Sequence, residues 1–277
     1  MHKNKMQTTH ANKLFSLVFL IMLAMLVSLK PAKASTIILD FTSNSSTNIF
    51  GVSTSAFDSS SFGFTGLSHS QVIESIFDTV VDDFFGYVYP SLPPGKELDL
   101  DFEIGTVGSG PLNGDNDYSY FTIGEDYQNQ TGSLGHACLS CALTDNFSFS
   151  AGAVVGSIFT DNLLNLAQLA LTDEDRINLI AGTTSHEIGH ALSLPHPSGA
   201  EANPGESSYG LMATGASPAN MPNGERILDR AFSYSNFEQL ISAVGLRDIT
   251  VDVPEPGTVM LMFMSLVLLA SRKKLSK

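Results

Sequence analysis

The sequence predicts an α+β fold, and three observations support this prediction. Segments with the two-residue period of a strand and segments with the three- to four-residue spacing of a helix follow one another along the chain. No internal repeat is apparent. After the last long helical segment comes irregular chain with one further short helix. The order of strand, helix, strands and helix, followed by irregular chain and a helix, is typical of an α+β domain.

The first half of the chain supplies a strand, a helix and a second strand. "STIILDFTS", which begins at Ser35, is rich in β-branched residues and is predicted to be a strand. Residues 44–70 have no period, which predicts irregular structure. Residues 70–88 are predicted to be helical with Ser70 as N-cap. Prolines then break the chain, and residues 96–107 alternate apolar and acidic residues as a strand does. The apolar residues of the helix are Val72, Ile73, Ile76, Phe77, Val80, Val81, Phe84 and Phe85, and those of the strand are Leu98, Leu100, Phe102 and Ile104.

The second half contains the longest predicted helix, from Asp173 to Leu192. Thr172 can cap its N-terminus, and Asp175 places a carboxylate in the first turn. The other expected elements are short: strands over Tyr118–Gly124 and 148–160, and helices over 161–171 and near 236–244.

Both ends of the chain have the composition of sorting signals. Residues 1–34 carry lysines, an apolar run and then Ala32-Lys33-Ala34, which is the order found in a cleaved secretory signal peptide. A retained membrane anchor is the alternative, but the apolar run is a little short for a span of ~20 residues. Residues 253–277 place Pro254, Glu255 and Pro256 before a short apolar run and a basic tail.

The C-terminal order resembles the PEP-CTERM sorting signal of exported bacterial proteins. This resemblance implies transient membrane association of the hydrophobic helix, recognition by an exosortase-type enzyme and removal of the tail. It also implies export through the inner membrane to the cell surface or extracellular matrix. An ordinary C-terminal anchor is the alternative. The expected organisation is a signal peptide over 1–34, one domain over 35–252 and a sorting signal over 253–277.

The expected mature domain, residues 35–252, is strongly acidic. It contains five basic and 27 acidic residues, a formal charge of −22. Such a surface repels phosphate groups and anionic lipid, so nucleic acid is not an expected partner. Its 218 residues are enough for one domain with a sizeable core.

Two further motifs have several interpretations. Cys138 and Cys141 lie in "HACLSC"; a disulfide is the default in an exported chain, with free thiols, a redox pair or zinc binding together with His136 as alternatives. The acidic stretch from Gly114 to Asp126 suggests Ca²⁺ as a second cofactor. It lacks the residue series of an EF-hand, and a solvated acidic loop is the alternative.

The stretch "HEIGHALSLPH" contains a candidate metal site. His186 and His190 are four residues apart on the predicted helix and therefore share one face. Two imidazoles at this spacing can bind one zinc ion at ~2.0–2.1 Å. Glu187 can accept a proton from a water that the metal activates. Pro195 ends the helix, so a turn can return His196 to the same ion.

The pattern of three histidines and a glutamate resembles the metzincin clan of zinc metalloproteases. The resemblance implies a twisted mixed sheet with two main helices, a zinc cleft on the active-site helix and an irregular C-terminal subdomain. It carries over His186, His190 and His196 as ligands and Glu187 as general base, and it matches Met212 to the clan's methionine turn. Two positions depart from the clan: Ser193 replaces the glycine of the turn, and Thr214 stands where one branch has a tyrosine ligand. If the turn needs φ > 0, serine costs ~1 kcal/mol there.

The sequence therefore predicts an exported zinc endopeptidase. Its protein or peptide substrate is expected to lie along an edge strand by β-augmentation. One alternative is a surface or matrix structural protein whose metal site is not catalytic. Another is a zinc hydrolase that acts on a bond other than a peptide bond.

Overall fold

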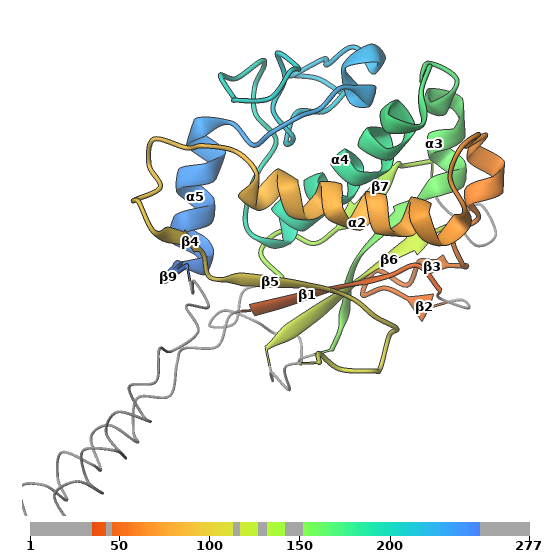
Figure 1. Cartoon of the computed structure of the whole chain (residues 1–277), viewed down its shortest axis with the longest axis horizontal. Helices are drawn as coiled ribbons and strands as arrows, with labels where there is room; N and C mark the ends of the chain where they lie inside the picture. The colour runs from red at the N-terminus through yellow and green to blue at the C-terminus, as the bar shows by residue number, and fades with distance from the viewer. Residues whose placement is uncertain (1–34, 43–45, 113–116, 127–131, 142–151, 250–277) are drawn as a thin grey trace, which may run out of the picture.

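A central five-stranded sheet organises the domain (Figure 1). The computed structural model describes residues 35–42, 46–112, 117–126, 132–141 and 152–249, so the predicted sorting signals lie outside the described residues. The strand order is β5-β1-β6-β8-β7. The strands are β1 (Ser35–Asp40), β5 (Leu100–Ile104), β6 (Tyr118–Gly124), β7 (Gly135–Ala137) and β8 (Val154–Phe159). Four of them are parallel and β7 is antiparallel to β8, which confirms a mixed sheet.

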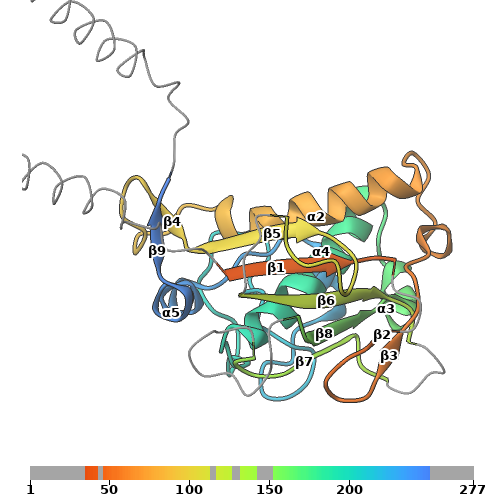
Figure 2. The same ribbon diagram turned by 90° about the horizontal axis from the view of Figure 1, so that it is seen from below.

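Two long helices, α2 (His69–Phe85) and α4 (Asp173–Ala191), lie on one face of this sheet (Figure 2). They pack against each other, and α4 also packs against β7 and β8. The main hydrophobic core fills the space between helices and sheet, with Ile76 and Val80 from α2, Phe121 from β6 and Ile180 from α4 all fully buried. The shorter helices are α3 (Thr160–Ala167) and α5 (Tyr234–Val244). The predicted α+β class with two main helices is therefore confirmed.

The N-terminus of α2 lies two residues before the predicted position. Ser68 is the N-cap: its side chain accepts a hydrogen bond from the Gln71 amide, and the Gln71 side chain accepts one from the Ser68 amide. This reciprocal pair is a capping box, which satisfies two amides that the helix leaves unpaired. The prediction of Ser70 as N-cap was wrong because it followed the apolar spacing, which begins only at Val72.

The strand predicted over residues 96–107 is interrupted. Its first part is β4 (Lys96–Leu98), which pairs antiparallel with β9 (Leu246–Asp248), and its second part is β5, which pairs with β1. Between them the Asp99 amide donates to the carbonyl of Gly245. The alternating pattern continues through the break, with Leu98 and Leu100 buried on either side of Asp99, so the sequence gives no sign that the partner strand changes.

The remaining strands and helices agree with the predictions or were too short to predict. β6 has the predicted bounds, and β8, α3 and α5 fall within or beside the predicted segments. The two-residue strands β2 (Ser46–Thr47) and β3 (Ser53–Thr54) and the edge strand β7 were missed. Residues 193–233 contain only the short 3₁₀ helix η3 (Asn223–Ile227), which agrees with the irregular C-terminal part that was predicted.

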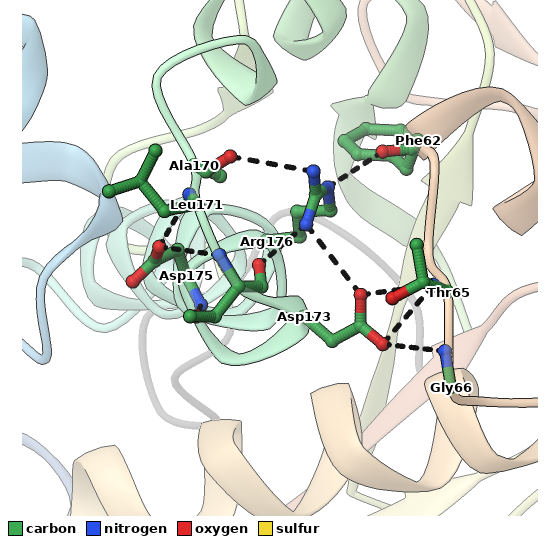
Figure 3. A network of polar contacts seen from close by, with 9 residues as sticks. Phe62, Thr65, Gly66, Ala170, Leu171, Asp173, Asp175 and Arg176 are labelled. Carbon is green, nitrogen blue, oxygen red and sulfur yellow. Dashed lines mark hydrogen bonds and ion pairs between the residues drawn. The ribbon is translucent and has the colours of Figure 1, made fainter.

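The start of α4 is fixed by polar contacts with its own first turn and with a distant loop (Figure 3). Thr172 and Asp175 form a capping box, as the sequence predicted. Asp173 accepts hydrogen bonds from the amides of Thr65 and Gly66, and Arg176 donates to the carbonyl of Phe62. These bonds join the helix to a segment more than 100 positions away. They therefore fix the position at which α4 begins.

No helix in the described part of the chain is long and apolar enough to cross a membrane.

The position of the α2 cap can be tested by a matched pair of substitutions. Ser68→Ala removes the capping hydroxyl and is expected to lower the free energy of unfolding by about 1 kcal/mol. Ser70→Ala lies inside the first turn and is expected to change it by no more than ~0.5 kcal/mol. Urea unfolding of the two variants measures the difference. Equal effects of the two substitutions would contradict the assignment.

Candidate metal centre

Helix α4 presents His186 and His190 on one face, and backbone carbonyls fix both rings. The Nδ1 atom of His186 lies 2.7 Å from the carbonyl oxygen of Leu211, and the Nδ1 atom of His190 lies 2.7 Å from that of Leu194. A carbonyl oxygen can only accept, so each Nδ1 must carry the proton. Each Nε2 atom is then left with a free lone pair.

The turn after α4 brings the third histidine back to the first two. Ser193 adopts a left-handed backbone with φ of 76°, and the Leu194 amide donates to the carbonyl of Gly189. The chain therefore turns back directly after the end of α4. The Nε2 atom of His196 then lies 3.1 Å from that of His186 and 2.8 Å from that of His190. The φ of Ser193 is therefore positive, the case for which a cost of serine relative to glycine was expected.

Three imidazole nitrogens at these distances fit a metal ion. The Nε2 atoms of His186 and His190 carry lone pairs, and the single Nε2 proton of His196 can point at only one of them. At least one of the two close contacts therefore has no hydrogen bond directed along it, and a cation bound by the lone pairs would account for the close approach of the three nitrogen atoms. Ligands of a tetrahedral zinc ion at ~2.0–2.1 Å stand about 3.3 Å apart. Among the described residues, these three form the only cluster of three or more potential ligand side chains.

The protonation of the histidines also favours metal binding. Burial lowers the pKa of His186 well below its ordinary value, and burial lowers the pKa of His190 and His196 as well. A neutral imidazole is the form that binds a metal, so the ligands need little deprotonation at neutral pH.

Met212 lies directly under the histidine-bearing helix. Its side chain is fully buried, and a Cβ atom placed on Gly189 would come within 2.5 Å of its sulfur. A larger residue than glycine at position 189 would require the Met212 side chain to shift. The adjacent Leu211 supplies the carbonyl that holds His186. The segment around Met212 therefore supports the first ligand from below.

Glu187 is buried between α4 and the edge strand β7. Only 6% of the residue is exposed, and its side chain accepts a hydrogen bond from the Ala137 amide. Burial raises the pKa of Glu187 to about 8, while the bond from Ala137 acts in the opposite direction. A nearby cation lowers a carboxyl pKa. The carboxyl group is thus placed where it can exchange a proton near neutral pH.

Gly135 of β7 makes room for this carboxylate. A Cβ atom at Gly135 would lie 2.6 Å from both Cγ and Oε1 of Glu187. Gly135 could not be identified from the sequence, because its importance depends on how β7 packs on α4. The residues next to Gly135 in the sequence show no pattern that predicts this contact.

A cleft of about 550 Å³ opens beside the three histidines. One wall is the chain from Gly132 to Ala137, which includes β7, and the floor is α4. Thr214 lines the cleft at the position where one metzincin branch has a tyrosine. The nearby Tyr209 does not take the place of that tyrosine, because it packs in a small separate cluster with Met221. Arg226 and Arg230 also line the cleft, and neither was identified as a site residue from the sequence.

The two cysteines lie next to the histidine turn. Cys138 and Cys141 are joined by a disulfide just after β7. Between them Ser140 also has positive φ, its amide donates to the carbonyl of His190, and its hydroxyl lies 2.7 Å from that of Ser193. Serine at position 193 therefore has a hydrogen-bond partner that glycine would lack.

The acidic stretch from Gly114 to Asp126, proposed to bind calcium, is only partly described. About half of it forms β6, and residues 114–116 lie outside the described residues. Calcium binding stays a prediction.

Two substitutions at Ser193 separate the cost of its backbone from the benefit of its hydroxyl. Ser193→Ala keeps the left-handed strain but loses the hydrogen bond to Ser140, so the free energy of unfolding should fall by about 1 kcal/mol. Ser193→Gly loses the same bond but relieves ~1 kcal/mol of strain, so its stability should stay closer to that of the wild type. Thermal unfolding compares them. An alanine variant as stable as the glycine variant would contradict this balance.

Gly135→Ala should displace the carboxylate of Glu187 without touching the histidines. Any hydrolytic activity of the site is expected to fall by about 100-fold, because a displacement of ~1 Å is enough for such a loss. Zinc content, measured by atomic absorption, should stay unchanged. Gly132→Ala is the matched control, since a Cβ there meets nothing within 4 Å although Gly132 lines the same cleft. Equal activity of the two variants would show that Gly135 has no such role.

No protein-family model and no curated protein matches the chain. Among solved structures, the chain is similar to metalloproteinase-II from Bacteroides fragilis, with 12% identity and a TM-score of 0.38 over 78% of this chain and 55% of that one. It is also similar to archaemetzincin from Methanopyrus kandleri, with 12% identity and a TM-score of 0.38 over 78% of this chain and 98% of that one. The chain thus spans about half the length of the Bacteroides structure. What the site can do chemically is therefore inferred from the side chains of this chain.

Proposed function

We propose that this protein is a zinc-dependent endopeptidase of the metzincin type. The observation that carries the proposal is the convergence of three Nε2 atoms, with two of the rings held by carbonyls, beside a buried glutamate. His186, His190 and His196 would hold the ion. When bound there, Zn²⁺ supplies a Lewis acid that polarises a peptide carbonyl and lowers the pKa of water to ~7.

Glu187 supplies the proton transfers that peptide hydrolysis requires. Its carboxylate takes a proton from the attacking water and later gives that proton to the leaving amine. The Ala137 amide and the backbone of Gly135 hold the carboxylate in place. Because Glu187 and His186 are adjacent on α4, the base and a metal ligand move together.

The edge strand β7 supports a peptide as the substrate. It pairs with β8 on one side only within the described sheet. All three residues of β7 line the cleft, so its other edge could accept an extended peptide by strand addition. An extended substrate lying there would pass over the three histidines with its backbone aligned by hydrogen bonds. This feature favours a peptide over other substrates with a hydrolysable bond.

A structural metal site is the second candidate, and the number of ligands argues against it. Structural zinc sites usually have four protein ligands, whereas catalytic sites have three and leave one position open. Only three converge among the described residues. A structural site also needs no buried carboxylate next to a ligand.

We further propose that the protein is exported and acts at the cell surface or in the extracellular matrix. The order of features at both termini supports this proposal, as does the strongly acidic composition of residues 35–252. An exosortase-type enzyme would be the processing partner of the C-terminal signal.

Replacement of Glu187 by glutamine tests the proposed function. The purified wild type should contain one zinc ion per chain and cleave a peptide library, and a chelator should abolish cleavage. Glu187→Gln keeps the shape and burial of the side chain but removes the base, so zinc content should stay the same while cleavage falls by about 100-fold or more. His190→Ala is the complementary variant, because it should lose zinc and cleavage together. Zinc-free wild type, or full activity of Glu187→Gln, would overturn the proposal.

A further inference from the structure

The basic side chains of the described domain are distributed unevenly. There are five, and three of them form ion pairs: Lys96 with Asp248, Arg176 with Asp173, and Arg247 with Glu97 and Asp101. The other two, Arg226 and Arg230, have no carboxylate within 4.0 Å among the described residues. Both line the cleft beside the histidines. In a domain with 27 acidic residues, two unpaired arginines at one site require an explanation.

Arg230 is a buried cation without an ionic partner. The residue is 2% exposed, its Nε atom has no hydrogen-bond acceptor, and its one hydrogen bond in the described structure runs to the sulfur of Met221 at 3.8 Å. The guanidinium lies against α4 at Gly182, where a Cβ atom would come within 2.7 Å of one of its nitrogen atoms. A glycine in the middle of a helix costs ~1 kcal/mol relative to alanine. Here that glycine lets the guanidinium approach the helix backbone.

Arg226 lies close to Arg230 and adds a second positive charge. Its Nε atom is also buried without an acceptor, and a Cβ atom at Gly215 would lie 3.2 Å from its guanidinium. Burial and the charge of Arg226 both lower the pKa of Arg230, so the two cations interact unfavourably. Two acidic residues are near enough to oppose this effect, but neither forms an ion pair with Arg230. Glu225 is engaged by the Ser207 hydroxyl at 2.6 Å, and Asp83 is itself buried on α2.

A buried guanidinium is costly unless an anion and hydrogen bonds compensate it. Guanidinium groups bind carboxylates through paired hydrogen bonds in a fixed, planar geometry. We propose that Arg226 and Arg230 form a carboxylate-binding subsite of the cleft. The subsite selects peptides that carry an acidic side chain, or a free C-terminal carboxylate, next to the bond that is cleaved. This inference rests on the proposed function, since it names the substrate class of the same site.

The position of the subsite fits a residue adjacent to the cleaved bond. Gly182, on which Arg230 lies, is one helical turn before His186, and one turn of helix is ~5.4 Å. An extended peptide advances ~3.3 Å per residue. The side chain of an aspartate or glutamate beside the cleaved bond can therefore extend from the three histidines to the guanidinium of Arg230.

Cleavage of matched peptides tests the selection. Three of the substrates are peptides that differ at one position next to the cleaved bond, with Glu, Gln or Lys there. A further pair of peptides ends at that position with either a free carboxylate or an amide. The wild type is expected to prefer Glu over Gln by at least tenfold in kcat/KM, which corresponds to roughly 1.4 kcal/mol. The terminal pair shows whether a C-terminal carboxylate serves as well as a side chain.

The variants locate the preference in the two arginines. Arg226→Gln should reduce the Glu/Gln ratio to near one, and Arg226→Lys should restore part of it. Lys96→Gln is the control for lost charge, because Lys96 is on β4, outside the residues that line the cleft, and should leave the ratio unchanged. Arg230→Gln is made second, with its thermal unfolding measured alongside, since this side chain is buried. A wild type without a preference, or an Arg226→Gln variant with the wild-type ratio, overturns the proposal.

Binding separates this proposal from the proposed function. The Glu and Gln peptides are titrated into the Glu187→Gln variant by calorimetry, where no cleavage interferes. Tighter binding of the Glu peptide that disappears in the Glu187→Gln, Arg226→Gln double variant supports the subsite even if the wild type cleaves nothing. Equal affinity for the two peptides refutes the subsite even if the wild type is an active peptidase.

Discussion

The hydrogen bonds from the Nδ1 atoms of His186 and His190 to backbone carbonyls are the constraint on which the site depends. They fix the tautomer of each ring and direct both Nε2 lone pairs toward His196. Each carbonyl belongs to a segment that has to be placed for this purpose. Leu194 is positioned by the left-handed turn at Ser193, and Leu211 by the contact of Met212 with α4. The irregular chain after α4 thus has a specific task, which is to supply the carbonyls that orient the ligands.

The sheet contributes to the site through its edge. β7 is antiparallel to β8 and lies against α4, so the backbone of Gly135 and the amide of Ala137 reach Glu187. The disulfide between Cys138 and Cys141 follows at once, and the serine it encloses holds both the last turn of α4 and Ser193. Strand, disulfide loop and helix end are therefore one connected unit around the carboxylate and the histidines. A change in any of them would alter the positions of Glu187 and the three histidines.

Sequence reasoning succeeded where the deciding contacts are local. The grouping of His186, Glu187 and His190 follows from helical spacing, and the capping box at Thr172 follows from residues three apart. It failed where partners are distant. The break at Asp99 depends on β9, almost 150 positions later. The cap of α2 is a separate, local error, because Ser68 precedes the apolar pattern, which starts at Val72. Gly135 and the two arginines had no local signature, because their importance arises only when β7 and residues 223–230 fold onto α4.

The electrostatic character of the cleft differs from that of the domain as a whole. A formal charge of −22 over residues 35–252 repels acidic peptides at long range, and this repulsion weakens as salt screens it. Arg226 and Arg230 act only at short range, where burial protects their charge from screening. An acidic peptide is therefore disfavoured on approach and favoured on contact. Selection in the cleft must then come from the fit of one carboxylate between two guanidinium groups, and a peptide rich in acidic residues elsewhere gains nothing from the rest of the surface.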